Sequence, residues 1–197
     1  SLTDLELNEL SEKTYVNNIE NDYMVDGLSE NESNIFADSS SESESNQWNL
    51  EAINATNANA AAIENTEKPE KVKVALMDSG VSATEYIDVY KRINLIPEQE
   101  NVEALFDDVS GHGTGMASII AGNDIKGIKG IAPNVELYSI KVLDENNEAP
   151  VSRIIQGIYK CIEEKVDIIN IVLMRSIRNG KVRYAAVAHL VERHLAK

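Results

Sequence analysis

The stretch KVKVALMDSG, Lys71 to Gly80, decides the fold of this chain. Its apolar side chains are those of Val72, Val74, Leu76 and Met77. A short apolar run that contains β-branched residues and stops at Asp-Ser-Gly predicts a buried strand rather than a helix. Asp78 then stands at the strand end, and chemistry in open α/β sheets gathers outside the carboxyl ends of strands. The alternative for Asp78 is an Asx turn, in which the carboxylate only accepts bonds from nearby backbone N–H groups.

A histidine between two glycines follows 34 residues after Asp78, in the segment SGHGT from Ser110 to Thr114. An apolar run after it, ending at Gly122, predicts a helix that begins near His112. Flanking glycines let the backbone approach closely and aim the ring at a partner. A carboxylate at a strand end and a histidine at a helix start are two parts of a nucleophile–base–orienter system. A histidine satisfied within the core is the alternative.

Three segments of the chain resemble motifs of the subtilisin-like serine proteases, or subtilases. VALMDSGV resembles the Asp motif of that family, GHGTGMASIIAG its His motif, and GIKGIAPNVELYSIKVL the segment that follows the His motif. The order, Asp before His, is also that of the family. The resemblance covers roughly residues 48–173 and implies an N-terminal fragment of such a protease. It also implies that Asp78 orients His112 and that His112 is the general base.

The later segments predict an α/β fold with a parallel sheet. Val135–Val142 and Val166–Leu173 are apolar runs typical of buried parallel strands, and Val151–Glu164 repeats apolar residues on one helical face. A strand, a helix and a strand joined by a right-handed crossover make such a sheet. The resemblance implies the subtilisin-like version of this fold, in truncated form. Cys161 is the only cysteine, which excludes an internal disulfide, and its place on the apolar face predicts a buried thiol.

The acidity of the chain belongs to its leading segment. Of the net charge of −15, the first 70 residues carry −14. Thr3 and Glu6 form a capping box that predicts a short amphipathic helix, and Tyr15–Val25 contains candidate strand residues. Helix plus strand at residues 1–25 resembles the end of a subtilase propeptide, an intramolecular partner of the protease domain; an acidic surface helix with a tail is the alternative. Residues 26–46, rich in Ser and Glu, predict an acidic disordered linker.

The domain that resembles a subtilase is expected at residues 47–173, as a partial catalytic domain. Residues 174–197 form a tail with 6 basic and 1 acidic side chain and no motif of the family. The 197 residues also contain no Gly-Thr-Ser nucleophile motif, so no nucleophile serine is assigned in this chain. We expect a truncation or a frameshift after Leu173; the alternative is a divergent helix at Ala185–Leu195.

The function predicted from the resemblance is that of a serine-type endopeptidase, a hydrolase of peptide or protein substrates, in an incomplete domain that alone is inactive. A non-catalytic pseudoprotease or peptide-binding module is the alternative. A nucleotide-binding module is disfavoured because the glycines after the first strand form neither GxGxxG nor a P-loop. The absence of a basic patch argues against nucleic acid as a partner, and no apolar run reaches membrane-spanning length.

Two smaller expectations concern acidic residues. The resemblance implies no required cofactor. The alternative is a calcium site in the loop Asn123–Gly130, where Asp124 is the only carboxylate. Asp107 and Asp108, just before the His motif, predict a solvated turn. The resemblance also implies a secreted or cell-surface protein, although the sequence shows no signal-peptide pattern.

Overall fold

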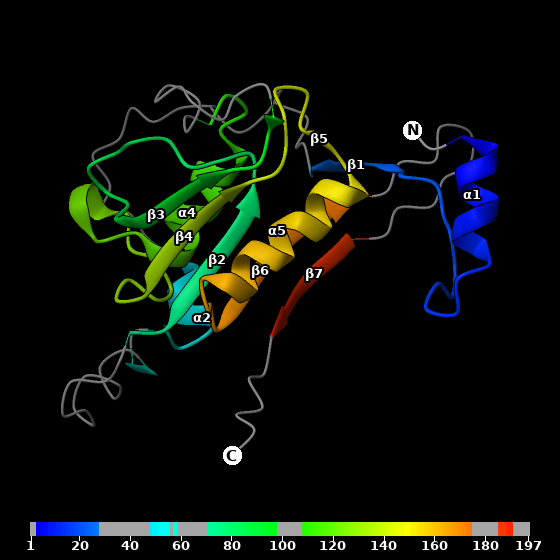
Figure 1. Cartoon of the computed structure of the whole chain (residues 1–197). Helices are drawn as coiled ribbons and strands as arrows, with labels where there is room; N and C mark the ends of the chain where they lie inside the picture. The colour runs from blue at the N-terminus through cyan, green and yellow to red at the C-terminus, as the bar shows by residue number, and fades with distance from the viewer. Residues whose placement is uncertain are drawn as a thin grey trace, which may run out of the picture.

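The computed structural model describes residues 3–27, 48–55, 57–58, 71–97, 108–174 and 185–190, and it contains a mixed sheet with helices on its two faces (Figure 1). The strands are β1 (Met24–Gly27), β2 (Lys73–Asp78), β3 (Val89–Asn94), β4 (Glu136–Lys141), β5 (Glu148–Pro150), β6 (Ile168–Met174) and β7 (Ala185–Leu190). The helices are α1 (Asp4–Ser11), α2 (Trp48–Ala52), α4 (His112–Ala121) and α5 (Val151–Glu163), with a 3₁₀ turn, η3, at Ile125–Gly127. The predicted α/β fold with a parallel sheet is confirmed.

The central strands β3, β4, β2 and β6 lie in that order, and each neighbouring pair is parallel. β2 is the first of the four along the chain but lies between β4 and β6, so the strand order reverses beside it. In open α/β sheets such a reversal leaves a crevice beyond the carboxyl ends of the strands, where functional sites form. Asp78, the last residue of β2, therefore stands at the switch point of the sheet. Its backbone carbonyl accepts hydrogen bonds from the N–H groups of Val142 (2.9 Å) and Leu143 (3.2 Å), which fix the strand end.

β2 divides its side chains between two hydrophobic cores. Ala75 and Met77 belong to the core beneath α5, which crosses in front of the sheet in Figure 1. Leu76 belongs to the other core, with Ala117 of α4. Successive side chains of a strand point to opposite faces, so Asp78 falls on the same face as Leu76. The alternation of β2 therefore directs the Asp78 carboxylate toward the helix that begins with the histidine of the SGHGT segment.

α5 buries one face, as predicted, through Ile154, Gly157 and Cys161. Burial raises the pKa of the Cys161 thiol to about 12, so at neutral pH this buried side chain carries its proton. The buried face is narrower than the apolar pattern suggested. Ile155 and Ile162 are 48% and 57% exposed, because α5 is the outermost layer on its side of the sheet.

The leading segment forms the predicted capped helix but a shorter strand than expected. The Thr3 hydroxyl and Glu6 carboxylate close a capping box on α1, which has no buried residue and stands apart from the sheet in Figure 1. The strand is confined to β1, since only these residues reach β5 and β6, and Tyr15 is 76% exposed. Asp26 and Gly27, expected at the start of the acidic linker, belong to β1; the rest of that linker lies outside the described residues.

The other end of the described chain contradicts one alternative, the divergent helix at Ala185–Leu195. Residues Ala185–Leu190 form β7, antiparallel to β6, rather than the start of a helix. Helix propensity is a weak preference, and the open edge of β6 offers backbone hydrogen bonds that override it. In the ranges that the structure describes, no helix is long and apolar enough to cross a membrane.

Candidate active site

Asp78 and His112 come together at the carboxyl end of β2. The His112 Nδ1 atom lies 2.8 Å from Asp78 Oδ1 and 2.9 Å from Oδ2. A carboxylate only accepts hydrogen bonds, so Nδ1 carries the hydrogen and donates it. The contact predicted from the two motifs is present, and the chemical roles of the two residues stay a prediction.

The two side chains differ in their access to solvent. The Asp78 side chain is 1% exposed and that of His112 is 19% exposed. The buried carboxylate is held by other donors, since the Ser79 backbone N–H donates to Asp78 Oδ1 at 2.7 Å. In such a low-dielectric setting the attraction between a carboxylate and an imidazolium is stronger than in water. The pair thus combines a buried carboxylate with a histidine ring that solvent still reaches.

Gly113 allows α4 to come this close to the turn after β2. A Cβ atom at this position would lie 2.1 Å from the Gly80 carbonyl oxygen and 3.2 Å from Asp78 Oδ1. Gly111, on the other side of the histidine, has a φ of 77° and is the N-cap residue of α4. That left-handed conformation suits glycine, and Gly111 offers no side chain as a cap. The close approach expected of the glycines is thus present at Gly113, and Gly111 adds a left-handed turn before the helix.

Side chains from outside α4 satisfy the first backbone N–H groups of the helix. The Asp108 carboxylate accepts from Gly111 N–H at 3.0 Å and from Thr114 N–H at 2.7 Å. Ser79 Oγ accepts from Gly113 N–H at 3.1 Å. These donors have no partner within a helix, so the caps stabilise both its position and its start. The solvated turn expected for Asp108 is wrong: the residue is 8% exposed because its carboxylate turns inward onto these donors.

Asp108 and Ser79 are the site residues that the sequence reasoning missed. The Ser79 hydroxyl lies 2.7 Å from Asp108 Oδ1 and 3.1 Å from Asp78 Oδ1, so it bridges the two carboxylates. Ser110 Oγ joins the same network, 2.9 Å from Ser79 Oγ. The signal was available in the sequence as an acidic residue shortly before a helix whose N-cap is glycine and cannot cap itself.

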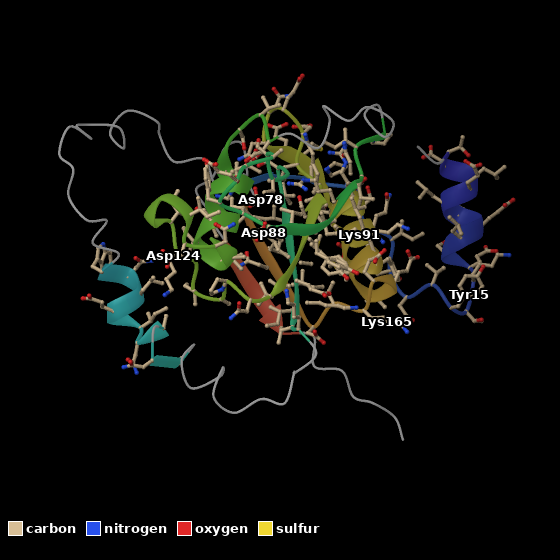
Figure 2. All side chains as sticks on the ribbon, turned by 90° about the vertical axis from the view of Figure 1, so that its left-hand side faces the viewer. Tyr15, Asp78, Asp88, Lys91, Asp124 and Lys165 are labelled. Atoms are coloured by element: carbon tan, nitrogen blue, oxygen red, sulfur yellow. The ribbon has the colours of Figure 1, made fainter. Side chains whose placement is uncertain are left out.

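The predicted calcium ligand, Asp124, lies away from the Asp78–His112 pair (Figure 2). Figure 2 shows Asp78 amid the strands and Asp124 on the outer side of the molecule. The Asp124 side chain is 61% exposed, and its carboxylate lies 4.0 Å from the Lys129 ammonium. Among the described residues there is no cluster of three or more His, Cys, Asp or Glu side chains able to hold a metal. Side-chain carboxylates alone therefore do not supply the six or more oxygens that calcium takes, and a calcium site in this loop stays a prediction.

Comparison with known proteins identifies the family. The model of the Subtilase family matches residues 69–189, which include β2, α4 and the Asp78–His112 contact. The chain belongs to the subtilase family. The family match extends beyond Met174, into a tail in which we found no subtilase motif, and the expected domain boundaries stay predictions.

Individual subtilases show the same similarity over a limited part of their length. An intracellular serine protease of Paenibacillus polymyxa is 40% identical over 119 residues, covering 58% of this chain and 36% of that protein. The minor extracellular protease Epr of Bacillus subtilis is 28% identical over 181 residues, 91% of this chain and 27% of that protein. Subtilisin E of Bacillus subtilis is 38% identical over 104 residues, 52% of this chain and 26% of that protein.

The chain thus spans about a quarter to a third of the length of these curated relatives. They include one protease named as intracellular and one named as extracellular. The secreted or cell-surface location therefore stays a prediction.

Proposed function

We propose that Asp78 and His112 are the orienting acid and the general base of a serine-type endopeptidase. The observation that carries this proposal is the contact of His112 Nδ1 with both carboxylate oxygens of Asp78, at 2.8 and 2.9 Å, at the switch point of a subtilase sheet. In a system of this kind the carboxylate fixes the tautomer in which Nδ1 carries hydrogen. Nε2 is then the nitrogen that takes a proton from the nucleophile and later gives it to the leaving amine. Peptides or proteins would be the substrates.

The attack itself requires a serine hydroxyl within about 3 Å of the base. The serines near His112 hold structural positions. Ser79 Oγ accepts from Gly113 N–H, and Ser110 Oγ accepts from His112 N–H at 3.2 Å. The 197 residues contain no Gly-Thr-Ser motif. We therefore propose that this chain supplies the acid and the base, and that the acyl-transfer step requires a nucleophile from outside its sequence.

A second proposal concerns the leading segment, which we infer to be a propeptide that occupies the domain as an added strand. β1 pairs antiparallel with β5 along one side and with the end of β6 along the other. Strand addition of this kind is a common mode of peptide recognition. It also supports the alternative function, a pseudoprotease that binds peptides without cleaving them, because β1 shows that an extended segment fits between β5 and β6.

The leading segment also caps α5. Pro150 is the N-cap residue of that helix and offers no side-chain acceptor. Asp22 Oδ1 accepts from Ser152 N–H at 2.8 Å, and the Tyr23 carbonyl accepts from Val151 N–H at 2.8 Å. Hydrogen bonds from the Ser152 hydroxyl and backbone hold the pKa of Asp22 below its usual value. An acid at a helix start is favourable, so α5 gains its cap from the leading segment. This supports an intramolecular partner rather than a loose acidic tail.

Changing Val25 should release this strand. Val25 is 9% exposed and packs in the core with Ala149 and Leu173. Val25→Asp places a carboxylate there, and an unpaired buried charge costs several kcal/mol. We expect amide hydrogen exchange at Gly27, which donates to the Asn147 carbonyl at 2.7 Å, to accelerate by about a hundredfold or more.

The control for this experiment is the neighbouring residue. Met24 is 47% exposed, so Met24→Asp adds the same charge to the same strand without burying it. That variant should leave the exchange of the Gly27 amide within a few-fold of the unmodified chain. If Val25→Asp also leaves Gly27 protected, β1 is not held by its buried face, and the propeptide proposal loses its support.

The unmodified chain tests the proposal that this domain is incomplete because the nucleophile lies outside the sequence; we call this the incomplete-domain proposal. In a fluorogenic-peptide assay, and with a serine-directed phosphonate probe, it should show neither turnover nor labelling above background. The base is present, but no nucleophile motif accompanies it. His112→Ala, assayed in parallel, should be indistinguishable from the unmodified chain. Turnover or labelling that disappears in His112→Ala would show that another serine serves as the nucleophile, and the incomplete-domain proposal would be wrong.

A further inference from the structure

A second buried carboxylate lies beside the Asp78–His112 pair and is not part of it. Asp108 is 8% exposed and is linked to the pair through Ser79 and Ser110. Its Oδ1 atom lies within hydrogen-bond distance of Ser79 Oγ (2.7 Å), Ser110 Oγ (3.1 Å) and Gly111 N (3.0 Å). Its Oδ2 atom accepts from Thr114 N–H at 2.7 Å. Four hydrogen-bond donors therefore surround this buried carboxylate, and they fix its position.

The position of one hydrogen atom connects this network to the pair. The Ser79 hydroxyl has a single hydrogen to donate, and two carboxylate oxygens lie within its reach. Asp108 Oδ1 is closer, at 2.7 Å, than Asp78 Oδ1, at 3.1 Å. Ser79 Oγ also accepts from Gly113 N–H at 3.1 Å, and the shorter of its two carboxylate contacts favours Asp108 as the acceptor of its one hydrogen. The Asp108 oxygen therefore takes the hydrogen that would otherwise be donated to Asp78.

The direction of the Ser79 hydroxyl hydrogen matters because Asp78 Oδ1 already accepts two hydrogen bonds. The Ser79 backbone N–H donates at 2.7 Å, and His112 Nδ1 lies at 2.8 Å. A third donor would stabilise the negative charge of the carboxylate and weaken its attraction for the Nδ1 hydrogen. By removing that competitor, Asp108 leaves the Asp78 charge available to the histidine. Its bonds to Gly111 and Thr114 hold the turn that aims the ring.

We propose that Asp108 is a positioning residue for the Asp78–His112 pair: it draws the Ser79 hydroxyl hydrogen away from Asp78 and anchors the first turn of α4. This inference rests on the proposed roles of Asp78 and His112 and adds a third side chain to them. The hydrogen bonds of Asp108 go to the hydroxyls of Ser79 and Ser110 and to backbone N–H groups, so it acts through these groups rather than on the histidine ring itself.

The experiment observes the Nδ1 hydrogen of His112 directly, by proton NMR of the whole 197-residue chain labelled with ¹⁵N-histidine. His112→Ala assigns the resonance by its loss, and Asp78→Asn should abolish the strongly bonded, downfield signal. Asp108→Asn keeps the size of the side chain and removes its charge. We expect its Nδ1 signal to move upfield and the hydrogen to exchange about tenfold faster, the effect of weakening one hydrogen bond.

A double variant separates this role from a merely structural one. In Asp108→Asn a neutral amide, a weaker acceptor than a carboxylate, faces the Ser79 hydroxyl, which can then turn to the charged Asp78 oxygen; adding Ser79→Ala removes this donor. The double variant should therefore move the Nδ1 signal back toward its original position. If Asp108→Asn only damaged the turn, the second substitution would instead move the signal further away. Asp144→Asn is the matched control. Asp144 also caps backbone N–H groups, those of Asn146 (2.9 Å) and Glu148 (3.0 Å), but its carboxylate is not hydrogen-bonded to Asp78, His112 or Ser79.

The outcomes distinguish the two levels of the proposal. If Asp78→Asn leaves the signal unchanged, or the unmodified chain shows none, the Asp78–His112 pair itself fails. If Asp78→Asn abolishes the signal but Asp108→Asn changes it no more than Asp144→Asn, only the role of Asp108 is overturned. Should Asp108→Asn not fold, neutron diffraction of the unmodified chain decides. Deuterium on Ser79 Oγ directed at Asp108 Oδ1 supports the proposal, and deuterium directed at Asp78 contradicts it.

Discussion

A chimera in which residues 71–173 of this chain replace the matching segment of the Paenibacillus polymyxa intracellular serine protease should hydrolyse peptides, and His112→Ala should abolish that activity. The relative supplies the nucleophile, and this chain supplies the proposed acid and base. We expect kcat to fall by about six orders of magnitude, the loss known for the catalytic histidine of subtilisin, itself a member of this family. Asp78→Asn should lower kcat by about four orders, because the histidine loses the acceptor that fixes its tautomer.

The control for the chimera is an exposed acid near the pair in sequence. Asp88 lies on the surface, with its carboxylate 3.4 Å from the Asn123 amide nitrogen, and Asp88→Asn should leave kcat within a few-fold. Thermal melting confirms that each variant is folded before its kinetics are compared. A folded chimera that never turns over substrate would favour the pseudoprotease alternative. One that keeps most of its activity in His112→Ala would show that His112 is not the base.

The segments that could be predicted from sequence are those in which a local pattern and the tertiary fold agree. The apolar run before Asp78 is a buried parallel strand, and the glycines around His112 allow the sharp turn and close approach that their lack of a side chain suggested. The alternation of β2 even determines the face to which Asp78 belongs. The conformation of these residues depends mostly on their neighbours in sequence. The two motifs were therefore enough to predict the contact between Asp78 and His112.

The failures share a different cause, which is that the partner is distant in sequence. Ala185–Leu190 has acceptable helix propensity, yet it pairs with β6 because that strand presents an open edge. Tyr15–Val25 contains candidate strand residues, but only Met24–Gly27 pairs with another strand. Asp108 was assigned to solvent because acids in turns usually are. Its carboxylate caps the nearby N–H groups of Gly111 and Thr114, a role that the glycine N-cap could have indicated, but no local pattern indicates its contact with Ser79, 29 residues away.

The second large effect is expected from adding one methyl group, in Gly113→Ala. The new Cβ atom would lie 2.1 Å from the Gly80 carbonyl oxygen and 3.2 Å from the carbonyl carbon of the same residue. Both are backbone atoms, so no side chain can swing aside to relieve the overlap, and α4 must move away from the turn. That movement breaks the bond from Gly113 N–H to Ser79 Oγ and separates His112 from Asp78. We expect the free energy of unfolding, measured in urea, to fall by about 3 kcal/mol or more.

Two other glycines of the same motif provide matched controls for Gly113→Ala, with different expected signs. At Gly115, two residues further along α4, a Cβ atom would meet nothing within 4 Å. Gly115→Ala should therefore raise the free energy of unfolding by about 0.5–1 kcal/mol, because alanine loses less backbone entropy in a helix. A Cβ atom at Gly111 would also meet nothing within 4 Å, but the φ of this residue is 77°. Gly111→Ala should therefore lower the free energy of unfolding by about 1–2 kcal/mol through backbone strain alone. If all three changes had the same small effect, the close contact of α4 with the Asp78 turn would not exist in solution, and the pair would lose its structural basis.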